Sequence, residues 1–407
     1  MKCRLLVTTA VFTVLLVALC GCTTYDNFKQ GLIDDNQDTS TGINIGIFEP
    51  TTGVDKDAAL PEIQGIELAH KMQPKVMGKD VNLIYADNSS DINAAEPAIN
   101  TLIAKNPTVI LGSYGNLYSL IAADYMEKAK IPAITMTNTN PLVTRNNSYY
   151  FRICYIDSTQ GRLMANYLNS INVDKVGVLR PSKDDVAMAM DTVFTNGFED
   201  FSGKDDVVGY HSVYNAGDTD FTEQLEELRD SGVKHVLLLG DLTSVTNIIN
   251  QAADMGLNVT FLGDISWGGE DFREKLNENV NPGNVAFVQF FVTDGDDEKE
   301  KVSESRQKFL DAYQKTYGSK DPEEAVGLGY DAYMMALDVI EKATAGKDEI
   351  AGGETIRDLL LSDGYVFEGA SGTIMFNKRG DPKKNAYICT WDNNSITTIY
   401  TIETKDQ

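Results

Sequence analysis

The chain has 407 residues and a formal net charge of −25 at pH 7. This acidity argues against a nucleic-acid-binding protein, because contact with a phosphate backbone requires basic surface. The chain is also too long for one ordinary hydrophobic core, so we expect two lobes in the part that follows residue 41.

Residues 1–21 have the pattern of a lipoprotein signal peptide. Two basic residues precede an uncharged stretch at residues 5–19, which is shorter than the roughly 20 residues of a membrane-spanning helix. The following Leu19-Cys20-Gly21-Cys22 is similar to a bacterial lipobox, so we expect lipid attachment at Cys22. An ordinary cleaved signal peptide is the alternative. Residues 22–41 are polar and predict a flexible tether.

Short apolar runs alternate with helical patterns from Ile43 onward. In the first run, Ile43, Ile45 and Ile47 recur at the two-residue period of a strand. Further strands are expected at 81–85, 109–111 and 131–136, and helices at 60–72, 92–104 and 117–128. This alternation predicts βαβ units and a parallel sheet with helices on both faces.

A second series of the same kind begins after residue 157. Helices are expected at 158–171, 187–201, 221–231 and 244–255, and strands at 176–179, 207–210, 236–239 and 259–262. The chain then continues with helices at 299–317, 323–344 and 355–362 and ends with antiparallel strands at 373–376, 387–391 and 396–402. Two successive series predict an α/β fold with two Rossmann-like lobes.

Two loops that follow predicted strands carry polar groups suited to a small ligand. Residues 112–116 (GSYGN) offer glycine backbone amides and the side chains of Ser113 and Asn116. Residues 137–139 (TNT) offer hydroxyls and carbonyls for an ammonium or a carboxylate group. The alternative for the first loop is a glycine-rich turn with Asn116 as the N-cap of the next helix. Ligands of parallel sheets gather at such strand ends.

No pattern indicates catalysis or a metal site. The chain lacks G-x-S-x-G, H-E-x-x-H and P-loop motifs, and its three histidines are isolated. Cys154 and Cys389 have no ligand-spaced partners for zinc, and either a disulfide between them or two buried thiols is consistent with the sequence. Asp157 and Gln160 are interpreted as a helix-capping pair, and residues 327–329 (GLG) as close packing of a helix against a neighbour.

Seven stretches resemble, in order, motifs of the extracellular solute-binding proteins of ABC transporters that belong to the branched-chain amino acid (Leu/Ile/Val-binding) family. They are residues 47–69, NPTVILGSYGN, KIPAITMTNTNPLVT, YYFRICYIDSTQG, VTFLGDISW, GLGYDAYMMALDVI and GASGTIMFNKRGDP. The resemblance implies a type 1 periplasmic binding fold with a three-crossover hinge. Lobe I is then expected at residues 42–153 and 292–367, and lobe II at residues 154–291 and 368–407.

The resemblance also implies where a ligand binds. The expected first-lobe contacts are Tyr114, Gly115, Asn116, Thr137 and Thr139, and the expected second-lobe contacts are Asp185, Leu242, Thr243 and Asp264.

Some positions depart from the family pattern. Asn116 stands where a serine is usual, and the acidic residue that faces an ammonium group falls at Ile265 or at its neighbour Asp264. Ala58-Ala59 and Val186-Ala187 replace two aromatic-glycine pairs, so leucine-like specificity is not assumed.

The expected function is that of a surface lipoprotein without enzymatic activity. We expect it to bind a small polar solute, an amino acid or a related molecule, between closing lobes and to deliver it to an ABC permease with its ATPases. The alternative is a sensor of the same fold that signals to a membrane or protein partner. We expect a monomer without metal or cofactor, held by Cys22 on the outer face of the cell membrane of a Gram-positive bacterium.

Overall fold

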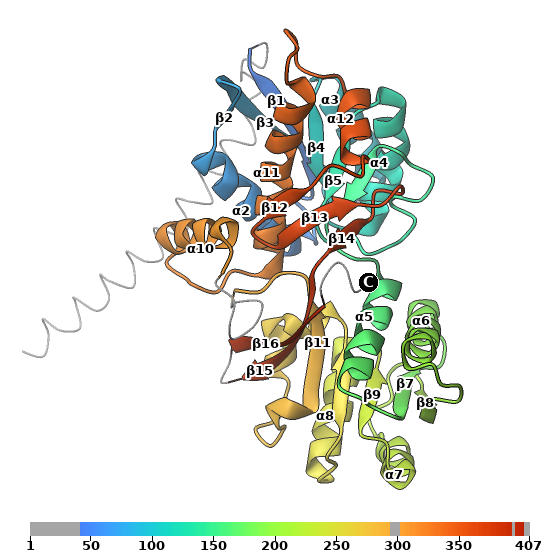
Figure 1. Ribbon diagram of the computed structural model, residues 1–407. Helices are drawn as coiled ribbons and strands as arrows, with labels where there is room; N and C mark the ends of the chain where they lie inside the picture. Colours follow the sequence, from blue (N-terminus) through green and yellow to red (C-terminus); the bar gives the residue numbers. More distant parts are fainter. Residues whose placement is uncertain (1–40, 294–301, 393–394, 403–407) are drawn as a thin grey trace, which may run out of the picture.

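The computed structural model describes residues 41–293, 302–392 and 395–402 and shows two α/β lobes, one above the other in Figure 1. The predicted fold class is confirmed, because each lobe contains a mainly parallel sheet between layers of helices. The predicted signal peptide, Cys22 and nearly all of the predicted tether lie outside the described residues. Within the described ranges, no helix is both long enough and apolar enough to cross a membrane.

The first lobe is built on a sheet of six strands in the order β2-β3-β1-β4-β5-β6. All neighbouring strands in it are parallel except β2 and β3. The strands are β1 (Ile43–Glu49), β2 (Lys75–Val76), β3 (Lys79–Asp87), β4 (Val109–Gly112), β5 (Ala133–Thr135) and β6 (Tyr150–Arg152). The helices are α2 (Lys56–Met72), α3 (Ile92–Ile103), α4 (Asn116–Ala129), α10 (Glu304–Tyr317), α11 (Glu324–Thr344) and α12 (Gly353–Leu360).

Helices cover both faces of this sheet because successive residues of β1 point to opposite sides. Ile45 belongs to the buried cluster that contains Ile66 of α2 and Leu328 of α11. Phe48 belongs to the cluster that contains Ile99 of α3 and residues of α4. The two-residue period predicted for this strand therefore corresponds to two separate cores.

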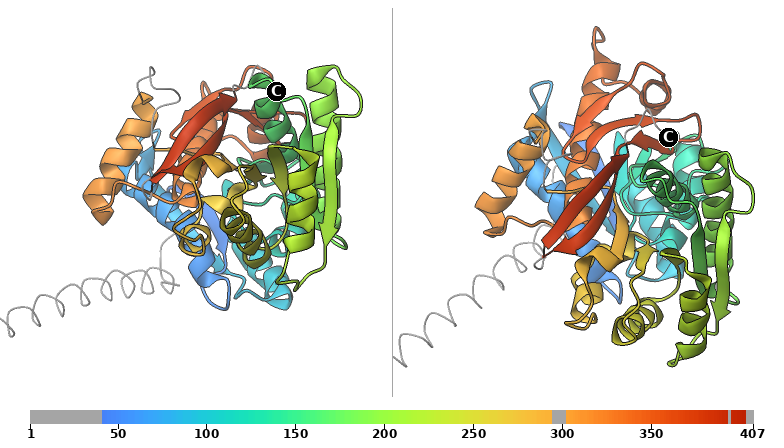
Figure 2. Two further views of the ribbon diagram at one scale, coloured as in Figure 1. Left: turned by 90° about the horizontal axis from the view of Figure 1, so that it is seen from below. Right: turned by 60° about the horizontal axis from the view of Figure 1, so that its bottom comes forward.

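The second lobe is built on a sheet of seven strands in the order β16-β15-β11-β10-β9-β7-β8. Its strands are β7 (Val176–Pro181), β8 (Val208–Tyr214), β9 (His235–Leu238), β10 (Thr260–Gly263), β11 (Val285–Gln289), β15 (Ala386–Asp392) and β16 (Ser395–Ile402). Its helices are α5 (Asp157–Ser170), α6 (Asp185–Ser202), α7 (Thr222–Ser231), α8 (Leu242–Asp254), η1 (Ile265–Gly268), α9 (Glu270–Glu274) and η2 (Pro282–Asn284). The predicted terminal hairpin forms the antiparallel edge of this sheet, beside β11 (Figure 2).

A third, antiparallel sheet packs on the first lobe. It contains β12 (Phe367–Gly369), β13 (Gly372–Phe376) and β14 (Pro382–Lys384). The carboxylate of Asp331 in α11 accepts hydrogen bonds from the backbone amides of Ala370 and Ser371. The rings of Phe151 in β6 and Phe376 in β13 meet with centroids 5.1 Å apart. The chain therefore enters the second lobe after residue 384, which is later than the predicted boundary at residue 368.

The three segments that connect the lobes meet at Tyr155. Its ring packs edge-on against Phe290, which directly follows β11 where the chain returns to the first lobe, with centroids 5.1 Å apart. Its hydroxyl donates to the backbone carbonyl of Lys384 and accepts from the backbone amide of the same residue, at the third connection. Tyr155 is thus the contact through which the three connections pack together.

Helices α2 and α11 approach each other unusually closely. A Cβ atom at Gly329 would lie 2.1 Å from the backbone oxygen of Glu62, and one at Gly65 would lie 2.1 Å from the backbone oxygen of Val326. Only glycine fits at such distances. The interpretation of residues 327–329 as helix packing is therefore confirmed.

The two described cysteines are separate thiols. Cys154 and Cys389 are both buried and unbonded to each other, so the disulfide alternative is excluded in this structure. The Cys154 thiol donates instead to the backbone oxygen of Asn138, at 3.2 Å.

Candidate functional site

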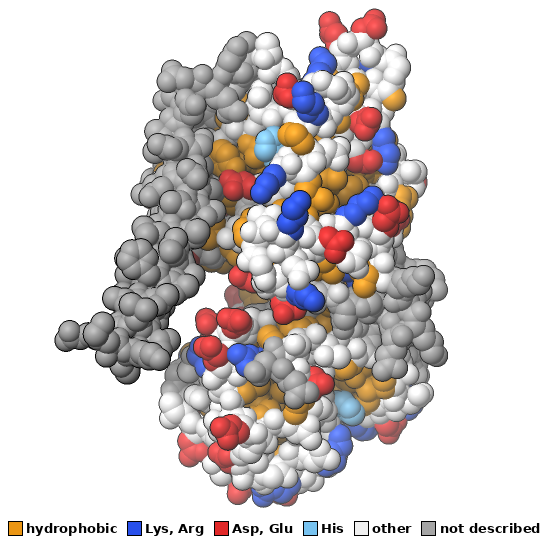
Figure 3. Space-filling view, turned by 90° about the vertical axis from the view of Figure 1, so that its left-hand side faces the viewer, with side chains coloured by type: hydrophobic (Ala, Val, Ile, Leu, Met, Phe, Trp, Pro, Cys, Tyr) orange, Lys and Arg blue, Asp and Glu red, His pale blue; other side chains and the backbone are white. Residues whose placement is uncertain are grey.

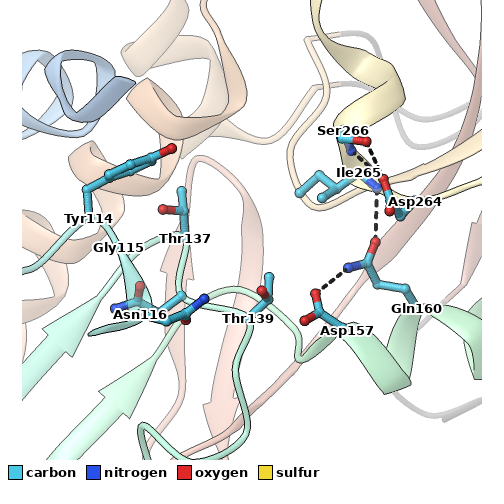
Figure 4. A pocket seen from close by; sticks show the side chains of 11 residues that line it. Tyr114, Gly115, Asn116, Thr137, Thr139, Asp157, Gln160, Asp264, Ile265 and Ser266 are labelled. Carbon is cyan, nitrogen blue, oxygen red and sulfur yellow. Dashed lines mark hydrogen bonds between the residues drawn. The ribbon is translucent and has the colours of Figure 1, made fainter. Parts of the chain in front are cut away.

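A pocket of about 380 Å³ lies between the lobes, where the molecular surface is hollowed (Figure 3). One wall consists of the loops that follow β4 and β5, and the facing wall consists of the start of α5 and the turn after β10 (Figure 4). The lining residues are Tyr114, Gly115, Asn116, Thr137, Asn138, Thr139, Asp157, Gln160, Asp264, Ile265 and Ser266. Both walls therefore stand at the carboxyl ends of strands, as the sequence predicted.

The first loop leads directly into the N-terminus of α4. Gly115 is the N-cap residue, with φ 87°, and no side chain caps the helix. The proposed alternative, Asn116 as the N-cap, is therefore wrong. The side-chain oxygen of Asn116 instead accepts from the backbone amide of Asn140, at 3.1 Å. The uncapped amides of the first helical turn, together with the helix dipole, favour an anionic group in the pocket.

The second loop is held by a buried side chain within it. The Asn138 amide nitrogen lies 2.8 Å from the backbone oxygen of Ser113, 2.6 Å from the hydroxyl of Ser119 and 2.7 Å from the hydroxyl of Thr135. The guanidinium of Arg152, also buried, donates to the backbone oxygen of Asn138 at 2.7 Å. Both loops of the first wall are thereby fixed to one another.

The side chain of Gln160 joins the two parts of the facing wall, the start of α5 and the turn after β10. The side-chain oxygen of Gln160 accepts from the backbone amide of Ile265, at 2.9 Å. Its side-chain nitrogen donates to Asp157, at 3.5 Å. The carboxylate of Asp264 caps the η1 turn by accepting from the amide and the hydroxyl of Ser266. This network, drawn in Figure 4, links the start of α5 to the turn after β10.

The pocket is electrostatically negative on its second-lobe side. Asp157 and Asp264 line it, and among the described residues no lysine, arginine or histidine does. Burial raises the pKa of both carboxyls, and the charge of Asp264 raises that of Asp157 further, against a hydrogen bond from Thr139. A cationic group in the pocket would therefore be stabilised by Asp157 and Asp264, while an anionic group would fit at α4.

The structure brings together six of the nine predicted ligand contacts. Tyr114, Gly115, Asn116, Thr137, Thr139 and Asp264 line the pocket. Asp185, Leu242 and Thr243 do not; they lie in the first turns of α6 and α8, and Asp185 and Thr243 are exposed. Their place in the site stays a prediction.

Five lining residues are not among the nine predicted contacts. Asn138, Ile265 and Ser266 are direct neighbours of predicted contacts. Asp157 and Gln160 were interpreted as a capping pair, but the N-cap of α5 is Ile156 and no side chain caps it. The available signal was the position of this polar pair directly after residues 153–156, where the chain crosses from the first lobe to the second.

The residues that replace the aromatic pairs do not form pocket walls. Ala59 is fully buried in α2, and the Val186 side chain is 56% exposed on α6. The larger nonpolar surfaces in the pocket come from Tyr114 and Ile265. The pocket thus combines two lobes, donors on one side and carboxylates on the other, which is the arrangement of a protein that holds a small polar solute between lobes.

Comparison with known proteins gives the family. The chain belongs to the periplasmic binding protein family, whose sequence profile matches residues 42–395. Members of this family are solute-binding proteins, and the resemblance to the branched-chain amino acid type is confirmed by the relatives.

The relatives are distant but extend over most of the chain. It is 23% identical to a Leu/Ile/Val-binding protein homolog of Brucella abortus, over 85% of this chain and 89% of that protein. It is 24% identical to a leucine-, isoleucine-, valine-, threonine-, and alanine-binding protein of Pseudomonas aeruginosa, over 84% and 87%.

Solved structures agree with this assignment. A leucine binding protein from Thermotoga maritima matches with a TM-score of 0.69 and 26% identity, over 90% of this chain and all (100%) of that chain. A branched-chain amino acid transporter substrate binding protein from Streptococcus pneumoniae, in complex with isoleucine, shares the fold with a TM-score of 0.68 at 23% identity, over 89% and 99%.

Proposed function

We propose that this protein is an exported lipoprotein that binds an amino acid or a related small molecule between its lobes and delivers it to an ABC permease. The observation that carries the proposal is the division of the pocket into uncapped helix amides on one wall and carboxylates on the other. A zwitterion satisfies both, with its carboxylate at α4 and its ammonium group at Asp157 and Asp264.

Hinge closure is the proposed mechanism of binding. Thr139 and the loop at residues 114–116 hold the ligand first on the first lobe, and the wall at Asp264 then closes over it. Thr139 already reaches the second wall, because its backbone oxygen accepts from the amide of Asp157 at 3.2 Å. The ligand stabilises the closed form by its contacts with both walls, and the protein performs no chemistry on it.

Export and anchoring are proposed from the leader sequence together with the family. The lipobox-like Leu19-Cys20-Gly21-Cys22 supports lipidation at Cys22. The proposal includes a monomeric protein on the outer face of the membrane. Mass spectrometry of the mature protein tests the anchor, and an unmodified N-terminal fragment that contains Cys22 would contradict it.

A ligand screen with a site variant tests the binding proposal. L-leucine, L-isoleucine, L-valine, L-threonine and L-alanine are screened by thermal shift, and the best is measured by calorimetry. At about 100 times its dissociation constant, a ligand adds roughly 2.7 kcal/mol of stability. We expect Asp264→Asn to weaken binding by about ten- to a hundredfold, because it removes a charged hydrogen-bond acceptor worth about 1.5 to 3 kcal/mol.

The matched control is Asp230→Asn, an exposed position on α7 outside the pocket, which should bind like the wild type. Stabilisation by no ligand of this panel or of a wider set of polar solutes would overturn the proposal. Transport by a reconstituted permease distinguishes a delivery protein from a sensor, since a sensor binds the same ligand without supporting uptake.

A further inference from the structure

Two glutamates are buried directly behind the first wall of the pocket. Glu49 is the last residue of β1 and Glu62 lies in α2, and neither side chain has any exposed surface. The two carboxyl groups are neighbours that interact electrostatically. None of the ion pairs among the described residues includes either of them. Two buried carboxylates without a counter-ion would be strongly unfavourable.

Each glutamate holds one loop of the pocket. The backbone amide of Tyr114 donates to Glu49 Oε2 at 2.6 Å, and the hydroxyl of Thr137 donates to Glu62 Oε1. The remaining oxygens, Glu49 Oε1 and Glu62 Oε2, are buried and have no donor among the described residues. One proton held between the two carboxyls supplies the missing donor and removes half of the buried charge.

We propose that Glu49 and Glu62 share one proton and act as positioning residues for the ligand pocket, so that loss of this proton weakens ligand binding. The proposal rests on the proposed function, because it assigns a role in ligand binding to groups that do not themselves line the pocket. Both groups act through Tyr114 and Thr137, which do line it.

The shared proton fixes the hydrogen-bonding direction of the pocket. The Thr137 hydroxyl donates its hydrogen to Glu62. Toward the ligand it therefore offers only lone pairs, which accept a hydrogen bond from an ammonium group. The Tyr114 amide is occupied by Glu49, so a ligand carboxylate must bind to the amides that follow it in α4. When both glutamates are ionised, their repulsion separates them and displaces the two loops that they hold.

The surroundings place the loss of the shared proton above neutral pH. Burial raises the pKa of both carboxyls, that of Glu62 to about 7, and the charge of Glu62 raises that of Glu49 further. The titratable groups that interact with the pair are Tyr114, Tyr150 and Cys154, with Arg152 next to them on β6. The first three also have raised pKa values and are neutral at pH 7, and Arg152 pairs with Asp381. Glu62 therefore ionises as the pH rises through about 7, and the one remaining proton stays on Glu49, between the two carboxyls, until the pH passes the higher pKa of Glu49.

Substitution of one acid by its amide tests the proposal. In Glu62→Gln, the side-chain oxygen still accepts from Thr137 and the amide N–H donates to Glu49 at every pH. The control is Glu67→Gln on the same helix, whose carboxyl also has a raised pKa but bonds to Tyr85 away from the pocket. Affinity is measured by calorimetry at pH 7.5, 8.5 and 9.5 for the best ligand among the five amino acids of the panel.

Between pH 7.5 and pH 9.5 we expect the wild type and Glu67→Gln to lose about tenfold more affinity than Glu62→Gln, as for one linked proton. Equal pH profiles for all three proteins would overturn the proposal. Titration of Asp157 and Asp264 cannot produce the expected loss of affinity, because their deprotonation strengthens cation binding as the pH rises.

A second measurement needs no ligand. The infrared difference spectrum between wild type and Glu62→Gln at pH 7.5 should contain the carbonyl band of a protonated carboxylic acid, which weakens as the pH is raised to 9.5. Glu49→Gln is the reciprocal variant and replaces Glu62→Gln if the latter does not fold. Absence of the band overturns the shared proton, whereas a band without binding of any solute overturns only the proposed function.

Discussion

Replacement of Asn138 by alanine tests whether the two loops of the first wall form one unit. The side chain is 1% exposed, and its nitrogen lies 2.6 to 2.8 Å from three acceptors, which belong to the loop after β4, to α4 and to β5. Its two N–H groups contribute about 1 kcal/mol each, and the buried hydroxyl of Thr135 also loses its donor, whereas Ser113 and Ser119 keep other hydrogen bonds. We therefore expect Asn138→Ala to lower the free energy of unfolding by about 2 to 4 kcal/mol.

The assay is urea unfolding followed by calorimetry of the folded variant. Asn147→Ala is the matched control, because Asn147 is also a buried asparagine of the first lobe. Its side chain donates to the backbone oxygen of Ala123 at 2.9 Å and accepts from the backbone amide of Tyr149 at 2.8 Å. We expect the control to lose about 2 kcal/mol of stability and to keep its ligand affinity. Asn138→Ala should lose at least tenfold in affinity. A variant as stable as the wild type would refute the reasoning.

Three further predictions concern packing, pH and thiols. Gly329→Ala should destabilise the protein by about 1 to 3 kcal/mol or more, because the added methyl group collides at the α2–α11 contact. Gly364 has open space around it, so Gly364→Ala should not destabilise the protein. Equal melting temperatures of the two variants would contradict this prediction. Because burial raises the pKa of Asp264, calorimetry should show affinity for an ammonium ligand falling on acidification at a higher pH than for an ordinary carboxylate, and constant affinity down to pH 4 would contradict it. Cys154 and Cys389 should resist alkylation in the native protein and react in urea; burial raises the pKa of the Cys154 thiol to about 12.

The fold and half of the pocket were predictable because they depend on local patterns. Thr137 and Thr139 directly follow a strand, and the glycine loop before α4 directly follows another, so their shared location at one sheet edge follows from parallel pairing. The second-lobe wall was harder. Asp185 and Thr243 also begin helices after strands, but which helix start faces the first lobe depends on sheet twist and on the angle between lobes, which no local pattern encodes.

The buried glutamate pair shows a signal that sequence reasoning passed over. Ile43, Ile45 and Ile47 point to one core, and Glu49 continues the same alternation into it. An acid at an inward position of a strand requires a partner, and the partner, Glu62, lies in the following helix. The period predicts burial of Glu49, but only the three-dimensional packing of α2 identifies Glu62.

A crystal structure with the best-binding amino acid tests the central claim most directly. The proposal predicts one ligand between the lobes, with its carboxylate at the first turn of α4. Its ammonium group donates to the hydroxyl oxygen of Thr137 and faces Asp264. A ligand bound elsewhere, or one that contacts only a single lobe in a fully closed protein, would contradict it.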